Sequence, residues 1–245
     1  MSISVVIVNF RTPQLTVDCL NSLASDSFWV AHSNTFIVDN NSGDDSLKIL
    51  RSWLVNSQHS SQNRLIPHSY NHGFSAGNNI GIKQSNGDFI LLLNSDTIVR
   101  PSAIDLLVQT LIDNPGMGMA SPRLEWPDEQ PQESCFRFHR PINELIRSAC
   151  TGPITKLLKR YEVPIPVCEE ISYPEWTSFA CVMIRREVFD DIGLLDEEFF
   201  MYFEDVDFCQ RSRRAGWNII HNPKARVVHL RGGSSPVKSQ AAKKK

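Results

Sequence analysis

The sequence predicts an α/β fold in which a mostly parallel central sheet is flanked by helices on both faces. Residues 3–8 form a run rich in β-branched side chains, which is typical of a strand buried on both faces. Short apolar runs then alternate with helical patterns through the first half of the chain. The length of 245 residues, with 41% hydrophobic and 21% charged residues, suits one α/β unit with a large core.

The first half of the chain is expected to alternate strands and helices. Thr12-Pro13 opens a helix, because proline is favoured at the first helical position, where an N–H group has no partner to lose. Leu15, Cys19, Leu20 and Leu23 give that helix one apolar face. Further strands are predicted at 35–38, 64–67 and 89–93, and further helices at about 47–54, 76–84 and 102–112.

The character of the sequence changes after Pro122, so we place a boundary there between two halves of one unit, 1–122 and 123–245. Prolines and acidic residues at 125–133 indicate an ordered or mobile loop. An amphipathic stretch is predicted at 142–158, a helix at 204–215, and strands at 179–184, 218–220 and 225–230.

Composition limits the classes of function. A formal net charge of −2 and a pI of about 6.4 argue against a nucleic-acid-binding protein, which would show a basic stripe. The basic C-terminal residues Lys238–Lys245 are interpreted as a solvated tail or as a contact with an anionic membrane surface. No CxxC pair occurs, and the cysteines are expected to be core side chains in a reducing compartment.

The N-terminus lacks the basic segment of a signal peptide and is better explained as a first strand. The apolar stretches, such as that at 89–93, are far too short to span a bilayer. We therefore expect a cytoplasmic protein whose contact with a membrane, if any, is peripheral.

Polar clusters follow three of the predicted strands, at Asn9, at Asp39 and at Asn94-Ser95-Asp96. Ligands of open parallel sheets bind beyond the carboxyl ends of the strands, so these clusters are candidates for a site. Asp96 follows five apolar residues, which would hold its carboxylate at the sheet edge, where a divalent cation bridging two phosphates needs oxygen ligands. The alternative for Asp96 is a turn or a helix N-cap.

A glycine-containing loop at 71–79 runs into a predicted helix. Gly73 and Gly77 would let the backbone approach a ligand closely, and amides at the start of a helix favour anions. Glycine-containing turns are common, so an ordinary turn is the alternative interpretation.

Three carboxylates, Glu204, Asp205 and Asp207, occupy the first turn of the predicted helix at 204–215. Compensation of the helix dipole explains them without any function. The aromatic run at 199–203, however, predicts a cleft floor shielded from water, where a carboxylate could take a proton from an attacking hydroxyl. His229 ends a late strand and is either structural or the completion of a metal shell with Asp96.

The chain resembles glycosyltransferase family 2, whose members have the GT-A fold, and is most similar to the rhamnosyltransferase-like branch of bacterial cell-surface polysaccharide synthesis. The matching motifs span nearly the whole chain and occur in the same order as in the family. A match of seven motifs in this order is specific to the family. The segments that carry it are 4–10, 38–42, 71–78, 92–96, 176–189, 203–208 and 229–234.

The resemblance implies a role for each candidate residue on the donor side. Asn94-Ser95-Asp96 stands where the family carries its Asp-x-Asp metal motif, so Asp96 matches the metal-binding carboxylate and Asn94 replaces the leading Asp. His229 matches a histidine that completes the metal site, and the implied cofactor is Mg²⁺ or Mn²⁺. Asn9 and Asp39 would hold the base and ribose, and Asn71, Gly73, Phe74, Gly77 and Asn78 would line the donor pocket.

The resemblance also implies the chemistry. Asp205 matches the catalytic base, Glu204 and Asp207 would shape the acceptor pocket, and Trp176 would lie beneath the donor sugar on the acceptor side. One displacement with one base inverts the anomeric configuration. The implied partners are a nucleotide-diphosphate sugar, with dTDP-rhamnose as the first candidate and UDP- or GDP-sugars as alternatives, and a glycan or lipid-linked acceptor.

Other classes of protein remain as alternatives. Asn94 in place of Asp favours a non-catalytic nucleotide-sugar-binding module. A nucleotidyltransferase would need a glycine-rich loop after the first strand, and a dehydrogenase would need GxGxxG there; the sequence has neither. Members of the resembled family often continue beyond a Lys-rich stretch like 241–245 with further helices, so truncation of the chain is one interpretation.

Overall fold

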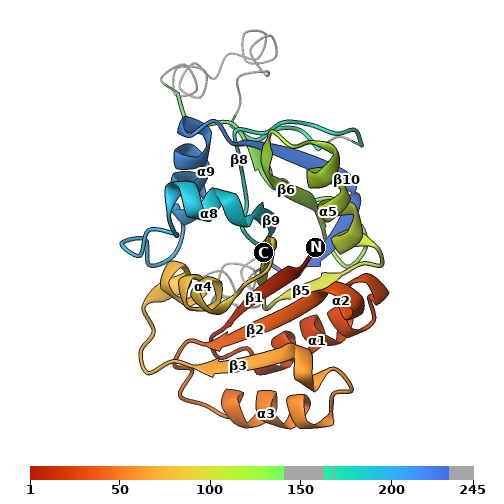
Figure 1. Ribbon diagram of the computed structural model, residues 1–245, viewed down its shortest axis with the longest axis vertical. Helices are drawn as coiled ribbons and strands as arrows, with labels where there is room; N and C mark the ends of the chain where they lie inside the picture. Colours follow the sequence, from red (N-terminus) through yellow and green to blue (C-terminus); the bar gives the residue numbers. More distant parts are fainter. Residues whose placement is uncertain (141–162, 168, 232–245) are drawn as a thin grey trace, which may run out of the picture.

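An eight-stranded sheet forms the centre of the computed structural model, which describes residues 1–140, 163–167 and 169–231 (Figure 1). The predicted amphipathic stretch at 142–158 and the basic tail lie outside the described residues. The strands of this sheet are β1 (Ile3–Asn9), β2 (Ser33–Asp39), β3 (Asn63–Pro67), β4 (Phe89–Asn94), β5 (Thr97–Val99), β6 (Met117–Glu125), β9 (Cys181–Arg185) and β10 (Asn218–His229).

The strand order is β3-β2-β1-β4-β9-β6-β10-β5. The pairs β3–β2, β2–β1, β1–β4 and β6–β10 are parallel, whereas β9 and β5 run against their neighbours. The prediction of an α/β fold with a mostly parallel sheet is therefore confirmed. A separate two-stranded sheet consists of β7 (Cys135–Phe136) and β8 (Trp176–Thr177).

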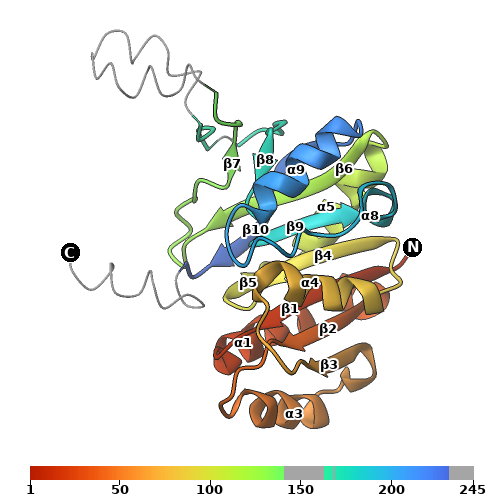
Figure 2. The same ribbon diagram turned by 90° about the vertical axis from the view of Figure 1, so that its left-hand side faces the viewer.

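Helices cover both faces of the sheet (Figures 1 and 2). One core cluster joins the sheet to α1 (Pro13–Ala24), α2 (Ser27–His32), α3 (Ser46–Asn56) and α5 (Ala103–Asp113). The other core cluster joins the opposite face to α4 (Gly73–Gln84), α8 (Arg186–Ile192) and α9 (Glu204–Arg214). A 3₁₀ turn, η1 (Ser60–Gln62), precedes β3. Burial of the β-branched strand β1 between the two layers explains its run of apolar residues.

The strands predicted at 218–220 and 225–230 form one strand, β10, so this part of the prediction is wrong. Pro223 has no N–H to donate, and the pairing of β10 with β6 shifts its register between Asn222 and Arg226. The side chain of Asn222 accepts a hydrogen bond from the backbone N–H of Lys224 at 3.0 Å, which stabilises the irregularity. The strand continues beyond it to His229.

Residue 122, where we placed the boundary between the two halves, lies within β6. Strands from both sides of this residue alternate in the one sheet, because β9 lies between β4 and β6. Cys19, Cys135, Cys181 and Cys209 are buried, as expected of small core side chains. None of the described helices has the length and apolar character needed to cross a membrane.

Candidate active site

The predicted polar clusters meet at one edge of the sheet, because the parallel strands end there together. The last residues of β1 and β2, Asn9 and Asp39, are register partners, and Asn94 at the end of β4 is paired with Val8. Figure 2 shows the tip of β10 at the left side of the molecule, and this strand ends in His229 at the same edge. The fold therefore brings together residues from both halves of the chain.

Asn9 is fully buried and holds Asp39 in place. Its Nδ2 donates to Asp39 Oδ1 at 2.7 Å and to Ser42 Oγ at 3.1 Å, while Thr16 Oγ1 donates to its Oδ1 at 2.9 Å. The hydroxyl of Ser42 also donates to Asp39 Oδ1 at 2.6 Å. These bonds hold Asn9 and Asp39 together, and the contact of both residues with the base and ribose of a nucleotide stays a prediction. Ser42 and Thr16 were not among the predicted site residues, although Ser42 lies within the recognised motif.

The loop before α4 packs against the chain segment that leads to α9. The N–H of Phe74 donates to the carbonyl of Phe200 at 2.7 Å, and the N–H of Gly73 donates to Asn71 Oδ1 at 2.9 Å. Ser75 Oγ donates to the carbonyl of Phe199 at 2.9 Å. These donors at the start of α4 are therefore used inside the protein, and their part in a donor pocket stays a prediction.

Glycines on α4 permit close packing of this helix on the sheet. A Cβ on Gly77 would lie 2.9 Å from Val8 Cγ1, and a Cβ on Gly81 would collide with Val6. Asn78, which is buried, donates to the carbonyl of Phe74 at 2.9 Å. The glycine pattern of this segment is explained by helix–sheet packing.

Asp96 and His229 face each other at the sheet edge. His229 Nε2 lies 3.5 Å from Asp96 Oδ1, and the backbone N–H of Leu230 donates to the carbonyl of Asp96 at 2.9 Å. The side-chain oxygen of Asn94 is buried without a hydrogen-bond partner. A carboxylate, an imidazole and an amide oxygen at one edge fit a divalent cation.

Among the described residues, no group of three or more His, Cys, Asp and Glu side chains is arranged to hold a metal ion. Asp96 and His229 would therefore hold the cation with help from non-protein ligands. Mg²⁺ and similar cations often use one or two protein carboxylates together with substrate phosphates and water. The residues present thus fit a metal that binds together with a phosphate-bearing ligand.

Glu204 and Asp205 begin α9 as a pair of poorly solvated carboxylates. Burial raises the pKa of Glu204 to about 7, and the nearby charge of Asp205 adds to this rise. Burial also raises the pKa of Asp205 to about 6, while hydrogen bonds from backbone N–H groups, including those of Val206 and Phe179, oppose the rise. A carboxylate with a pKa near 6 is a suitable proton acceptor at neutral pH.

The aromatic run before α9 does not form a cleft floor shielded from water, so that prediction is wrong. Phe200, Met201, Tyr202 and Phe203 are exposed, by up to 67% for Phe203. Tyr202 and Phe203 both have positive φ angles of 71°, which turn the chain sharply into α9. The shielding of Glu204 therefore comes from the body of the fold and not from this run.

Two residues predicted to lie at the acceptor side have partners within the protein. Asp207 Oδ2 accepts a hydrogen bond from Arg211 Nε at 2.8 Å, and this guanidinium also donates to the carbonyls of Ile192 and Leu194. Trp176 stacks on Phe136 with ring centroids 4.1 Å apart, and its Nε1 donates to the carbonyl of Arg137 at 3.0 Å. These contacts give both side chains a structural use.

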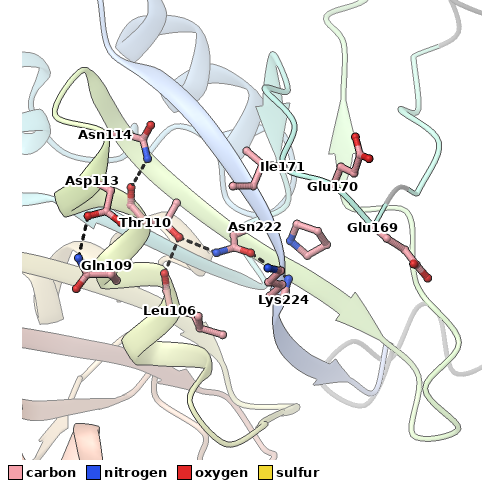
Figure 3. A pocket seen from close by; sticks show the side chains of 11 residues that line it. Leu106, Gln109, Thr110, Asp113, Asn114, Glu169, Glu170, Ile171, Asn222 and Lys224 are labelled. Atoms are coloured by element: carbon pink, nitrogen blue, oxygen red, sulfur yellow. Dashed lines mark hydrogen bonds between the residues drawn. The ribbon is translucent and has the colours of Figure 1, made fainter.

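A hollow of about 570 Å³ opens elsewhere, between α5, residues 169–171 and the irregular part of β10 (Figure 3). It contains none of the predicted site residues. The polar side chains at its base bond to each other: Asn222 Nδ2 donates to Thr110 Oγ1 at 2.7 Å, and that hydroxyl donates to the carbonyl of Leu106 at 2.6 Å. The hollow is therefore not part of the candidate site.

The fold belongs to the class of α/β proteins whose parallel strands end at a polar edge, where such sheets bind their ligands. Comparison with known families identifies the family within this class. A family model described as "Glycosyltransferase like family 2" matches residues 2–245. The chain therefore belongs to this family, as the sequence motifs predicted.

Relatives with names that describe a function are similar over much of the chain. An N-acetylglucosaminyl-diphospho-decaprenol L-rhamnosyltransferase of Mycobacterium tuberculosis is 28% identical over 70% of this chain and 60% of its own length. A low-salt glycan biosynthesis hexosyltransferase, Agl10, of Haloferax volcanii is 28% identical over 93% of this chain and 66% of its own length. The chain thus spans about 60% of the length of the mycobacterial relative.

Solved structures confirm the GT-A fold. A mannosyltransferase from Pyrobaculum calidifontis, in complex with GDP-Man and Mn²⁺, has a TM-score of 0.66 at 14% identity and covers 93% of this chain and 56% of its own. GalNAc-T7 with UDP, GalNAc and Mn²⁺ has a TM-score of 0.69 at 14% identity, covering 93% of this chain and 43% of its own. At this identity the likeness establishes the fold.

Proposed function

We propose that the chain is an inverting, metal-dependent glycosyltransferase that moves a sugar from a nucleotide-diphosphate donor to a hydroxyl of a glycan or lipid-linked acceptor. One arrangement carries this proposal. Phe208, one turn after Asp205 on α9, packs against Phe179 with ring centroids 5.8 Å apart, and the carbonyl of the next residue, Ala180, accepts a hydrogen bond from the N–H of Asn94 at 2.9 Å. The helix that carries the candidate base therefore packs against the segment that is bonded to the end of β4, two residues before Asp96.

In this proposal Asp205 accepts the proton of the acceptor hydroxyl as its oxygen attacks the anomeric carbon from the face opposite the leaving diphosphate. A single displacement with one base inverts the configuration, and no second carboxylate is needed as a nucleophile. General-base assistance of this kind contributes about 10²- to 10⁴-fold in rate. When bound at Asp96 and His229, a divalent cation would neutralise charge on the leaving diphosphate.

The donor we place first is dTDP-rhamnose. The supporting observation is the name of the mycobacterial relative, which describes an L-rhamnosyltransferase. The same name describes a decaprenol-linked acceptor, and this supports a lipid-linked acceptor. We place the protein in the cytoplasm, with peripheral contact with the membrane that holds such a lipid.

The experiment that tests this function is calorimetric titration with dTDP, UDP and GDP, each with and without Mn²⁺, followed by measurement of slow donor hydrolysis. We expect Mn²⁺-dependent binding of one nucleotide and hydrolysis of its sugar conjugate. Absence of binding by all three nucleotides would contradict the proposal.

A non-catalytic nucleotide-sugar-binding module is the second candidate, favoured by the uncharged Asn94 at the head of the metal motif. It predicts the same nucleotide binding with no hydrolysis of the donor, so the two measurements together separate the candidates.

A further inference from the structure

Trp126 lies at the same sheet edge as the candidate metal ligands, in the loop that follows β6. The parallel pairing of β6 with β10 joins Leu124 to Val227 and Glu125 to Val228, so Trp126 comes next in register with His229. Figure 2 shows the loop after β6 beside the tip of β10. Trp126 is 38% exposed, and the residues that follow it in the loop, 127–131, are polar or proline.

The loop that carries Trp126 is closed by its own backbone. The N–H of Trp126 donates to the carbonyl of Gln130 at 2.8 Å, and the N–H of Glu129 donates to the carbonyl of Trp126 at 2.9 Å. The N–H of Gln132 donates to the carbonyl of Leu124 at 2.7 Å, which closes the base of the loop. The indole is thus presented on a rigid turn.

A buried ion network fixes the base of this loop. The side chain of Glu125 is fully buried and accepts hydrogen bonds from Arg226 at 2.8 and 3.0 Å and from Arg100 at 3.1 Å. Arg123 lies 3.6 Å from the same carboxylate, and Arg226 also pairs with Glu129 at 2.8 Å. A buried carboxylate is tolerated only with such compensation, so the network makes the position of the loop specific.

Two contacts join the loop to the end of β10. Gln132 Nε2 donates to the carbonyl of His229 at 2.7 Å, and Arg231 Nη2 donates to the carbonyl of Glu133 at 2.6 Å. The guanidinium carbon of Arg231 lies 6.0 Å from the centre of the Trp126 ring, at the outer limit of a cation–π contact. The indole of Trp126 and the guanidinium of Arg231 therefore lie side by side, next to the candidate metal ligands.

We propose that Trp126 is a stacking platform for a pyranose ring of the acceptor, with Arg231 as a neighbouring hydrogen-bond donor to its hydroxyls. The apolar C–H face of a sugar is complementary to an exposed indole, and rigid aromatic residues bind at low cost in conformational entropy. This inference rests on the proposed function. It assigns specificity for the acceptor to a loop outside the recognised motifs.

The strand order explains why the platform serves the acceptor and not the donor. Asn9 and Asp39, the predicted nucleotide contacts, end β1 and β2, whereas β6 and β10 lie on the far side of β4 and β9. A nucleotide-sugar donor that extends from Asp39 to Asp96 and His229 does not cover the end of β6. The acceptor can therefore bind there.

The test measures sugar binding without requiring transfer. Wild type and Trp126→Ala, each saturated with the preferred nucleotide and Mn²⁺, are titrated with the methyl glycosides of rhamnose, N-acetylglucosamine, mannose and galactose, and binding is followed by saturation-transfer NMR. Trp126→Phe keeps an aromatic face. Ile112→Ala is the matched control, because Ile112 is 42% exposed and lies in the last turn of α5, which ends at the opposite edge of the sheet.

We expect at least one glycoside to bind wild type, with affinity about tenfold weaker in Trp126→Ala, within about threefold of wild type in Trp126→Phe, and unchanged in Ile112→Ala. Nucleotide affinity should be the same in all four proteins. The inference is overturned if no glycoside binds wild type, or if a bound glycoside is indifferent to Trp126→Ala. Failure of the proposed function is recognised separately, since wild type would then bind no nucleotide.

Discussion

Asp96 Oδ1 lies 3.5 Å from Nε2 of His229, although one residue follows β4 and the other ends the last strand. This distance is too long for a strong hydrogen bond and suits two ligands that share one cation. The backbone bond from Leu230 to the carbonyl of Asp96 fixes the two segments to each other.

The first prediction follows from this pair. Asp96→Ala and His229→Ala should each abolish the gain in nucleotide affinity that Mn²⁺ provides, because each would remove a protein ligand of the cation. Calorimetric titration of the nucleotide with and without Mn²⁺ measures the effect. Asp113→Ala, which removes a carboxylate at the end of α5, should leave the metal dependence intact. Metal dependence that survives in Asp96→Ala would refute the assignment.

Replacement of Asp205 by Asn should lower the rate of transfer by about 10²- to 10⁴-fold, because it removes the proton acceptor and leaves the shape of the site. Nucleotide affinity should change less than twofold. The control is Glu187→Gln in the first turn of α8, which lies outside the candidate site and loses its ion pair with Arg185. This control should reduce the free energy of unfolding by about 1 kcal/mol or less and keep the rate. Equal rates in wild type and Asp205→Asn would remove Asp205 from the mechanism.

The pH dependence of the reaction should report the same carboxylate. Since burial raises the pKa of Asp205 to about 6, the base is protonated and inactive below this pH. We expect kcat/KM for the donor to rise tenfold per pH unit below about 6 and to reach a plateau above it. A profile that stays flat from pH 5 to pH 8 would show that no group with this pKa takes part.

Glu204→Gln should stabilise the protein at neutral and higher pH. The pKa of Glu204 is raised to about 7 by burial, so the folded state binds its proton more tightly than the unfolded state does. Stability from this group is therefore full below its unfolded pKa and is lost as pH rises through about 7. The expected gain for Glu204→Gln is on the order of 1–3 kcal/mol at pH 8 and nothing at pH 4.

Denaturant unfolding at both pH values measures this difference. The neutral amide replaces a carboxylate whose Oε2 is buried without a hydrogen-bond partner, so the substitution introduces little strain. The same loss of stability at both pH values would indicate that Glu204 contributes through packing and not through its charge.

The elements of the first half were predictable because their signals are local. The apolar run of β1 and the proline at the start of α1 both lie where they were expected. The prediction missed β6, since Gly118 and Pro122 interrupt its apolar pattern. Gly118 is required there by packing, because a Cβ at this position would lie 2.7 Å from Val188 and 2.9 Å from Trp217. Such long-range crowding leaves no local signal in the sequence.

The candidate site was predictable in its residue types and less so in their surroundings. Polar residues at strand ends identified Asp39 and Asp96, and the parallel topology brought their strands together. Exposure of the run at 200–203 could not be read from the sequence, because it depends on how α4 anchors the carbonyl of Phe200. The sequence also did not reveal all the partners of the side chains. The spacing of Asp207 and Arg211 on a helix predicts the bond between them, but the bond from Arg211 to the carbonyl of Leu194 depends on tertiary packing.

The last prediction concerns Gly73 at the start of α4, which packs against the segment at 199–203 that precedes the candidate base Asp205. Gly73 has a φ of +90°, and a Cβ there would collide with the carbonyl oxygen of Phe200. Gly216 has a φ of +96°, and a Cβ added to it would meet no atom within 4 Å, so it offers the same backbone strain without the collision. Gly216→Ala should therefore cost only the strain, about 1 kcal/mol.

Gly73→Ala should cost more than Gly216→Ala in free energy of unfolding, because the segment at 199–203 must also move. That segment leads directly into Glu204 and Asp205, so Gly73→Ala should also lower the rate of transfer at temperatures where both variants are folded. Gly216→Ala should leave the rate of transfer unchanged. Denaturant unfolding and steady-state rates on the same preparations measure the two effects. Equal losses in both variants would mean that the contact with Phe200 does not position the base.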